Sequence, residues 1–153
     1  MREREILLVE DNDNDIILTK RALTKANVKN ELVIARDGVE AIDYLYGKVQ
    51  KNSGDGRLCP TLILLDLKLP KVDGLEVLER IRDNKITCVC PVVILTSSKE
   101  DIDLTRCYEL GANSYIRKPV NYVQFAEAIR QVGLYWLVLN EPPPAENICR
   151  TTR

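Results

Sequence analysis

The stretch LILLDLKLPKVDGLEVL at residues 62–78 decides the fold of this chain. Its first four residues form a continuous apolar run, which is typical of a parallel strand covered on both faces. Asp66 follows this run directly, and apolar residues then recur at helical spacing from Leu75 to Ile81. A buried strand that ends in a carboxylate and leads into a helix predicts one βα unit of a parallel sheet.

Four more apolar runs of strand length lie on either side of this unit. They are ILLV at 6–9, LVIA at 32–35, VVIL at 92–95 and SYI at 114–116. A segment of helical period follows each of them, at 15–26, 39–46, 102–110 and 125–136. This alternation predicts the α/β class, with a doubly wound (βα)5 fold and five parallel strands in the order 2-1-3-4-5.

The length of 153 residues suits one domain, and we expect that domain to span residues 1–140. Three consecutive prolines at 142–144 cannot continue a helix, so residues 141–153 are predicted to form an irregular tail. The polar, glycine-rich stretch at 47–60 lacks a period and predicts a long surface connection. This connection is either a tolerated insertion or a dedicated binding loop.

Charge and composition argue against several classes of protein. The 22 basic and 23 acidic residues nearly cancel and form no basic cluster, so we expect no direct nucleic-acid binding. No apolar stretch has the length of a signal peptide or a membrane span, which predicts a cytoplasmic protein without membrane contact. The chain has no histidine, which removes histidine-dependent nucleophilic sites and histidine-ligated metals.

The five cysteines do not indicate a disulfide framework. Their number is odd, and a chain without an export signal is expected in a reducing compartment. Cys88 and Cys90 are separated by one residue, which fits neither a C-x-x-C redox motif nor a common zinc site. We interpret both as small apolar residues in a loop.

Chemically active residues are expected at the carboxyl ends of the strands, where open α/β sheets bind ligands. Glu10 and Asp11 follow the first strand, and Asp66 follows the third. These strands are neighbours in the predicted order, so the three carboxylates should cluster and bind a cation, for which Mg²⁺ is the natural choice. Asp66 could then accept a phosphoryl group, with Lys118 and the Thr96 hydroxyl binding its oxygens.

The sequence resembles the receiver domains of two-component response regulators, which are chemotaxis-regulator-like proteins of flavodoxin-like fold. The segments that carry this resemblance are LLVEDN at 7–12, LILLDLKLPKVDGLEVL at 62–78, VVILTSS at 92–98 and GANSYIRKP at 111–119. The resemblance implies a single-domain regulator that accepts a phosphoryl group from a histidine kinase onto Asp66 in a phosphorelay. Its output would pass through protein contacts, and its chemistry would be limited to self-phosphorylation and self-dephosphorylation.

The resemblance also implies roles for the other site residues. The Mg²⁺ ligands would be Glu10, Asp11, Asp66 and the backbone carbonyl of Lys68.

Lys118 would bind the phosphoryl group, and the peptide bond between Lys118 and Pro119 would be cis. Thr96 and Tyr115 would be the switch pair, whose rearrangement repacks the surface of the fourth helix and fifth strand. The segments RDGVEAIDYL at 36–45 and YWLVLNEPP at 135–143 are similar to stand-alone regulators that partner phytochrome-type histidine kinases.

Two other functions fit the same fold class less well. An aspartyl-nucleophile phosphatase or phosphotransferase would need a second carboxylate two residues after Asp66, where Lys68 stands. A flavodoxin-type cofactor carrier would need a hydroxyl- or glycine-rich phosphate loop after the first strand, where EDND repels phosphate.

The end of the fifth helix is apolar nearly all round. Beside the expected core stripe of Val132, Trp136 and Leu139 it carries further apolar residues at 134, 135, 137 and 138. This surface packs either under the chain's own tail or in a homodimer. We expect a homodimer through the face made by the fourth helix, fifth strand and fifth helix.

Overall fold

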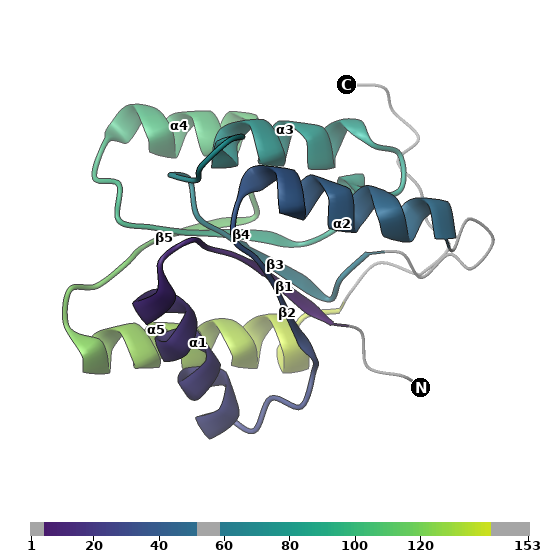
Figure 1. The fold of residues 1–153 in the computed structure, drawn as a ribbon. Coiled ribbons are helices and arrows are strands. Elements are labelled where there is room, and N and C mark those ends of the chain that lie inside the picture. The colour runs from purple at the N-terminus through teal and green to yellow at the C-terminus, as the bar shows by residue number, and fades with distance from the viewer. Residues whose placement is uncertain (1–4, 52–58, 142–153) are drawn as a thin grey trace.

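Five parallel strands form one sheet in the middle of the molecule (Figure 1). The structure is a computed structural model and describes residues 5–51 and 59–141. The strand order is β2-β1-β3-β4-β5, which confirms the predicted class and topology. The strands are β1 (Ile6–Val9), β2 (Leu32–Ala35), β3 (Leu62–Leu65), β4 (Val92–Thr96) and β5 (Ser114–Arg117).

Helices cover both faces of the sheet. As Figure 1 shows, α2, α3 and α4 lie on one face and α1 and α5 on the other. A short 3-10 helix precedes β4, and a π-helical segment continues α5. The bounds are α1 (Asp13–Lys25), α2 (Gly38–Lys51), α3 (Gly74–Asp83), η1 (Thr87–Val89), α4 (Asp101–Glu109), α5 (Tyr122–Leu134) and η2 (Tyr135–Leu139).

Two hydrophobic cores result from the alternation of side chains along each strand. In β1, Leu7 and Val9 belong to the core under α2, α3 and α4, whereas Ile6 and Leu8 belong to the core under α1 and α5. The central strands β1, β3 and β4 are buried along their whole length. Their continuous apolar runs therefore have the physical cause expected from the sequence, since both faces of these strands are covered.

Two helix ends are defined by particular capping residues. The Asn121 side chain accepts hydrogen bonds from the backbone N–H groups of Val123 and Gln124 at the start of α5. Gly111 follows the last residue of the α4 cap with a φ of 98°, a conformation that strains any residue with a side chain. Asn121 therefore fixes where α5 begins, and Gly111 fixes where α4 ends.

Helix α2 is longer than the sequence pattern indicated. The predicted surface connection was expected to begin at Gly47, but the helix continues to Lys51. The added residues contain no proline and include good helix formers, and the space around Gly47 is open, so nothing forces the helix to stop there. Residues 52–58 of that connection lie outside the described residues.

The end of the fifth helix differs from an ordinary α-helix. From Tyr135 to Leu139 the chain winds as a π-helix, with more residues per turn. This change of winding rotates later side chains away from their α-helical positions, and Leu139 is 65% exposed. The prediction that Leu139 continues the core stripe of Val132 is therefore wrong.

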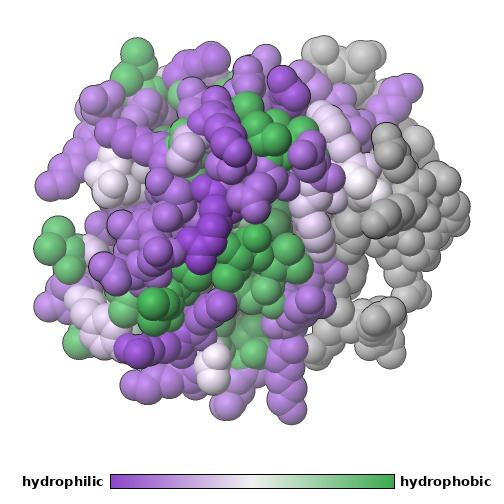
Figure 2. Space-filling view, in the orientation of Figure 1, coloured by the Kyte–Doolittle hydropathy of each residue, from purple (hydrophilic) through white to green (hydrophobic). Residues whose placement is uncertain are grey.

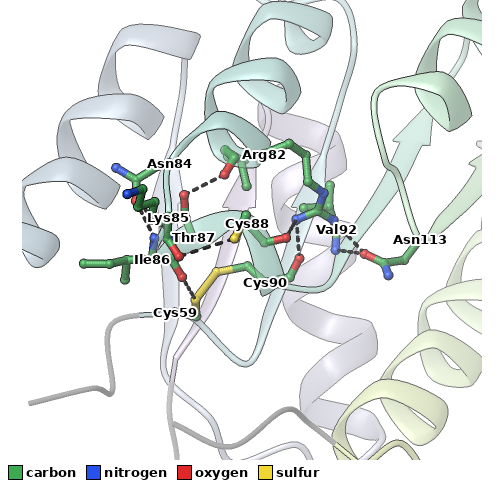
Figure 3. Close-up of a disulfide and its surroundings, with 11 residues drawn as sticks. Cys59, Arg82, Asn84, Lys85, Ile86, Thr87, Cys88, Cys90, Val92 and Asn113 are labelled. Carbon is green, nitrogen blue, oxygen red and sulfur yellow. Dashed lines mark hydrogen bonds between the residues drawn. A yellow bond between two sulfur atoms is a disulfide. The ribbon is translucent and has the colours of Figure 1, made fainter. Parts of the chain in front are cut away.

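Cys59 and Cys90 form a disulfide, so the expectation that the chain holds none is wrong (Figure 3). The cause is the pairing of β3 with β4, in which Ile63 lies opposite Val92. Residues that precede these two strands are thereby brought together, although 31 positions separate them in the sequence. Cys88 lies in η1 and not in an irregular loop, but it is buried, as expected for a small apolar residue.

The described surface is mostly polar on the face seen in Figure 1, and apolar surface gathers mainly in its middle (Figure 2). Within the described ranges, no helix has both the length and the apolar character needed to cross a membrane.

Residues 142–153 lie outside the described residues, so the irregular tail predicted at 141–153 stays a prediction.

Candidate functional site

The candidate site lies at the carboxyl ends of the central strands, as predicted. Backbone hydrogen bonds continue the strand pairing one residue further on each strand and so fix these positions. The Asp66 N–H donates to the carbonyl of Val9 at 3.0 Å, and the Lys118 N–H donates to the carbonyl of Thr96 at 2.7 Å. Sheet geometry therefore positions the backbone of the acidic and basic residues that the sequence singled out.

Three carboxylates form the predicted acidic cluster. Glu10, Asp11 and Asp66 each offer one oxygen, and these oxygens lie within 4.8 Å of one another. Glu10 and Asp66 are buried, whereas Asp11 is exposed. Two buried carboxylates with an exposed third form an oxygen-only donor set, open to solvent on one side, which fits a hard divalent cation.

Lys118 contacts two carboxylates of this cluster and a further one nearby. Its Nζ donates to Glu10 Oε2 at 2.6 Å, to Asp15 Oδ2 at 2.8 Å and to Asp66 Oδ2 at 3.1 Å. The Lys118 side chain is only 8% exposed, so solvent screens these contacts weakly. Asp15 was not among the predicted site residues, because an acidic residue in the first turn of a helix is usually explained by the helix dipole.

Crowding of negative charge changes the proton affinity of the site. Burial, followed by the charge of Asp66, raises the pKa of Glu10 to about 7 even though Lys118 opposes the shift. Burial alone would lower the pKa of Lys118, but its hydrogen bonds to Asp15 and Glu10 and the charge of Asp66 raise it above its usual value. One ammonium therefore does not fully neutralise the cluster, and a bound cation would complete the neutralisation.

The connection after β3 holds Asp66 in place. The Leu67 N–H donates to Asp66 Oδ1 at 2.7 Å, and the Gly74 N–H donates to the Leu67 carbonyl at 2.8 Å. A Cβ atom at Gly74 would lie 2.3 Å from the Asp66 carbonyl oxygen, so only glycine fits there. The start of α3 therefore packs directly against the backbone of Asp66.

Thr96 and Tyr115 lie on the neighbouring strands β4 and β5. Thr96 pairs with Arg117 and Ile94 pairs with Tyr115, which places Thr96 and Tyr115 on the same face of the sheet. Thr96 is fully buried, and its hydroxyl accepts a hydrogen bond from the Ser98 N–H at 3.3 Å. The Tyr115 hydroxyl is also buried and makes no hydrogen bond within the part of the chain that the structure describes.

Two further predictions concern Lys118 and Lys68. The described peptide bonds are all trans, so the predicted cis bond between Lys118 and Pro119 is wrong. The trans form is the intrinsically preferred one, and Lys118 contacts the carboxylates from the extended end of β5 without it. The exposed Lys68 lines an open groove of about 490 Å³ together with Asp11, and its carbonyl as a metal ligand stays a prediction.

Comparisons with known proteins agree with this geometry. The sequence model of the response regulator receiver domain matches residues 6–130. The chain is 41% identical over 138 residues to the probable methanogenesis regulatory protein FilR2 of Methanothrix harundinacea, covering 90% of this chain and 86% of that protein. It is 39% identical over 132 residues to the response regulator Rcp1 of Synechocystis, covering 86% and 88%.

Solved structures give the same result. The phosphorylated cyanobacterial phytochrome response regulator RcpA superposes with a TM-score of 0.84 at 38% identity, over 94% of this chain and 100% of that one. The Mn²⁺-bound form of Rcp1 has a TM-score of 0.82 at 36% identity, over 92% and 99%. The bacteriophytochrome response regulator AtBRR has a TM-score of 0.69 at 50% identity, over 92% and 100%.

These matches extend over most of this chain and over most of each of these relatives. They favour neither the phosphatase nor the flavodoxin-type alternative, since the matched proteins are regulators. The Mn²⁺ bound to Rcp1 accords with the acidic cluster of Glu10, Asp11 and Asp66 as a divalent-metal site. The strand order, the acidic cluster and the sequence matches lead to one conclusion: this chain belongs to the family of response regulator receiver domains and acts as a phosphoryl acceptor in two-component signalling.

Proposed function

We propose that Asp66 is the residue of this chain that accepts the phosphoryl group from a sensor histidine kinase. The observation that carries the proposal is the contact of Lys118 Nζ with Asp66 Oδ2 at 3.1 Å, inside the cluster of carboxylates. An acyl phosphate forms on a carboxylate only where positive charge offsets the charge that develops during transfer. Asp66 lies beside such a charge, and Asp11 of the same cluster and the next residue, Leu67, line an open groove.

We further propose that the metal ion is Mg²⁺ and that its ligands are Glu10, Asp11, Asp66 and the carbonyl of Lys68. When bound, Mg²⁺ supplies the positive charge that the three carboxylates and the phosphoryl group require. Lys118 exchanges one of its carboxylate contacts for a phosphoryl oxygen, and Glu10 and Asp15 keep its ammonium oriented. The chain's own part in the transfer is to hold the acceptor oxygen and this ammonium in place.

Thr96 and Tyr115 are proposed as the switch pair. The Thr96 hydroxyl, now bonded by Ser98, turns to a phosphoryl oxygen, and the Tyr115 ring adjusts to the space that this movement changes. Its buried hydroxyl lacks a hydrogen bond among the described residues, so movement of the ring breaks no such bond there. Phosphorylation then shifts an existing equilibrium between two packings of α4 and β5.

The test of the acceptor is a change of mass. The full chain is incubated with Mg²⁺ and a small phosphodonor and then weighed intact by mass spectrometry. We expect wild type to gain one phosphoryl group and Asp66→Asn to gain none, because an amide cannot form the acyl phosphate. Asp43→Asn, an exposed aspartate on α2, is the matched control and should gain the group. Phosphorylation of Asp66→Asn to the level of wild type would contradict the proposal.

The partners and the location are proposed from the relatives. RcpA and AtBRR are named as phytochrome response regulators, and we propose a phytochrome-type histidine kinase as the partner of this chain. We also propose a cytoplasmic location and an absence of direct DNA binding. The nearly balanced charge of 22 basic and 23 acidic residues supports the second point.

We propose that the face of α4, β5 and α5 is the output surface of this chain and that it forms a homodimer interface. Large apolar side chains on this face are exposed, among them Ile102 on α4 and Val123 on α5, at 68% and 69%. Light scattering of size-fractionated protein tests it, with and without phosphodonor. Val123→Lys should weaken the dimer, whereas the control Ile17→Lys on α1 should not. A wild type that stays monomeric at all concentrations would rule the dimer out and favour coverage by the chain's own tail.

A further inference from the structure

Three of the five cysteines meet at the end of the sheet opposite the phosphoryl site. Cys59 precedes β3, Cys88 lies in η1, and Cys90 lies between η1 and β4. The Cα atoms of Cys59 and Cys90, which form the disulfide, are 5.5 Å apart, a usual separation for a bridge. In Figure 3 the sulfur of Cys88 lies beside this bridge.

Cys88 is a second neighbour of this pair and has an interaction partner among the described residues. A cysteine sulfur forms one disulfide bond at a time, so the set holds one bridge and not two. Cys59 can then be joined to Cys90, or in a second arrangement to Cys88. The three residues are thus placed for exchange between two bridges that share one sulfur atom.

Two of the three sulfur atoms have hydrogen-bond acceptors for their reduced form. Cys59 Sγ lies 3.2 Å from the carbonyl oxygen of Ile86, and Cys88 Sγ lies 3.3 Å from that of Lys85. A thiol at either position can donate to that carbonyl, so opening the bridge leaves no buried donor unsatisfied there. Reduction of Cys59 or Cys88 therefore needs no new hydrogen-bond partner.

We propose that Cys59, Cys88 and Cys90 form a thiol–disulfide site, in which Cys59 is the shared sulfur and Cys88 and Cys90 are its alternating partners. In exchange, a Cys88 thiolate attacks Cys59 Sγ, the Cys59–Cys90 bond breaks, and Cys90 leaves as a thiolate that takes up a proton. In formation of the bridge, two protein thiols reduce one molecule of a low-molecular-weight disulfide, which leaves as two thiols. Under the cytoplasmic location proposed above, such a bridge is reversible, since disulfides of that compartment are usually transient and redox-sensing.

Burial decides which sulfur a small reagent reaches first. Cys90 is 1% exposed, whereas Cys88 and Cys59 are 7% and 9% exposed. A small thiol therefore attacks at Cys59, and Cys90 is reached only through exchange within the set. Cys59 therefore takes part both in attack by a small thiol and in exchange within the set of three cysteines.

Arg82 connects the bridge to the rest of the fold. Its guanidinium donates to the carbonyls of Cys88 at 3.1 Å and Cys90 at 2.8 Å and to Asn113 Oδ1 at 2.9 Å (Figure 3). It also donates to Gly111 O at 2.9 Å. Gly111 and Asn113 belong to the connection between α4 and β5. Arg82 therefore links the backbone of the cysteine cluster to that connection.

The test is a count of thiols. The full chain is equilibrated in glutathione buffers of graded redox potential, quenched and alkylated under denaturing conditions, and weighed. Wild type should carry five labels when reduced and three when oxidised, since the chain has five cysteines and one bridge uses two of them. Five labels in every buffer would overturn the proposal. This count involves no phosphoryl chemistry, so it can fail while the proposed function holds.

Single variants test the shared sulfur. Cys59→Ser should keep four labels in all buffers, whereas Cys90→Ser should fall from four to two, with a Cys59–Cys88 link in the peptide map. The control Cys107→Ser, a buried free cysteine elsewhere, should also fall from four to two. A Cys59→Ser protein that loses two labels, or a Cys90→Ser protein that keeps four, would overturn the shared role of Cys59.

A thermal measurement gives a second readout on wild type alone. Reduction opens a loop of 31 residues, and we expect the midpoint of thermal unfolding to fall by roughly 7–15 °C. An unchanged midpoint together with a constant label count would show that no bridge forms.

Discussion

Replacing Lys118 with methionine removes the ammonium that three carboxylates share. Its Nζ lies within 3.1 Å of an oxygen of Glu10, Asp15 and Asp66. Breaking a buried ion pair by removing one partner costs about 3–5 kcal/mol, because the remaining charge stays buried. Protonation of Glu10, whose pKa is already raised to about 7, relieves part of the repulsion. We therefore expect the free energy of unfolding to fall by about 3 kcal/mol in the absence of divalent metal.

Mg²⁺ should recover much of that loss, because a cation among the carboxylates replaces the missing positive charge. The measurement is urea unfolding followed by circular dichroism, once with a chelator and once with excess Mg²⁺. Lys20→Met on the exposed side of α1 is the control and should change the free energy of unfolding by less than about 0.5 kcal/mol. The reasoning is refuted if Lys118→Met loses the same stability in both buffers, or none with the chelator.

Three further substitutions test the backbone around the two sites. Gly74→Ala should cost about 2–3 kcal/mol in chemical unfolding and slow phosphorylation, because the new Cβ would lie 2.3 Å from the Asp66 carbonyl oxygen. Arg82→Met should cost about 4 kcal/mol in the same assay, since four hydrogen bonds are lost at ~1 kcal/mol each. Gly111→Ala should cost about 1–2 kcal/mol and lower the thermal midpoint, because its φ is 98° and Arg82 Nε would lie 3.0 Å from the new Cβ.

The fold and most of the site could be predicted because both depend on local patterns. A continuous apolar run such as LILL has one stable environment, the middle of a parallel sheet, and the strand order then places Glu10 beside Asp66. Chemically active residues are therefore expected directly after each run. The acidic cluster was therefore found without knowledge of any side-chain geometry.

The parts that were missed depend on how long side chains reach and how the chain winds. Asp15 contacts Lys118 across 103 positions of sequence, and nothing in its helical context distinguishes it from an ordinary first-turn carboxylate. The π-helical winding that exposes Leu139 leaves no periodic signal in five apolar residues. The bridge between Cys59 and Cys90 did have a signal, because residues that precede neighbouring parallel strands must lie side by side.

Strand β4 joins the two sites that the cysteines and carboxylates define. Its last residue is Thr96, and at its first residue the Val92 N–H donates to Asn113 Oδ1 at 2.8 Å. The same oxygen accepts from Arg82, which also binds the carbonyls of the bridged segment. Coupling between distant sites requires an element with two discrete arrangements. On the two proposals above, the alternative partners of Cys59 would act at one end of β4 and the Thr96 hydroxyl at the other, so oxidation and phosphorylation would bear on the same strand without sharing a residue.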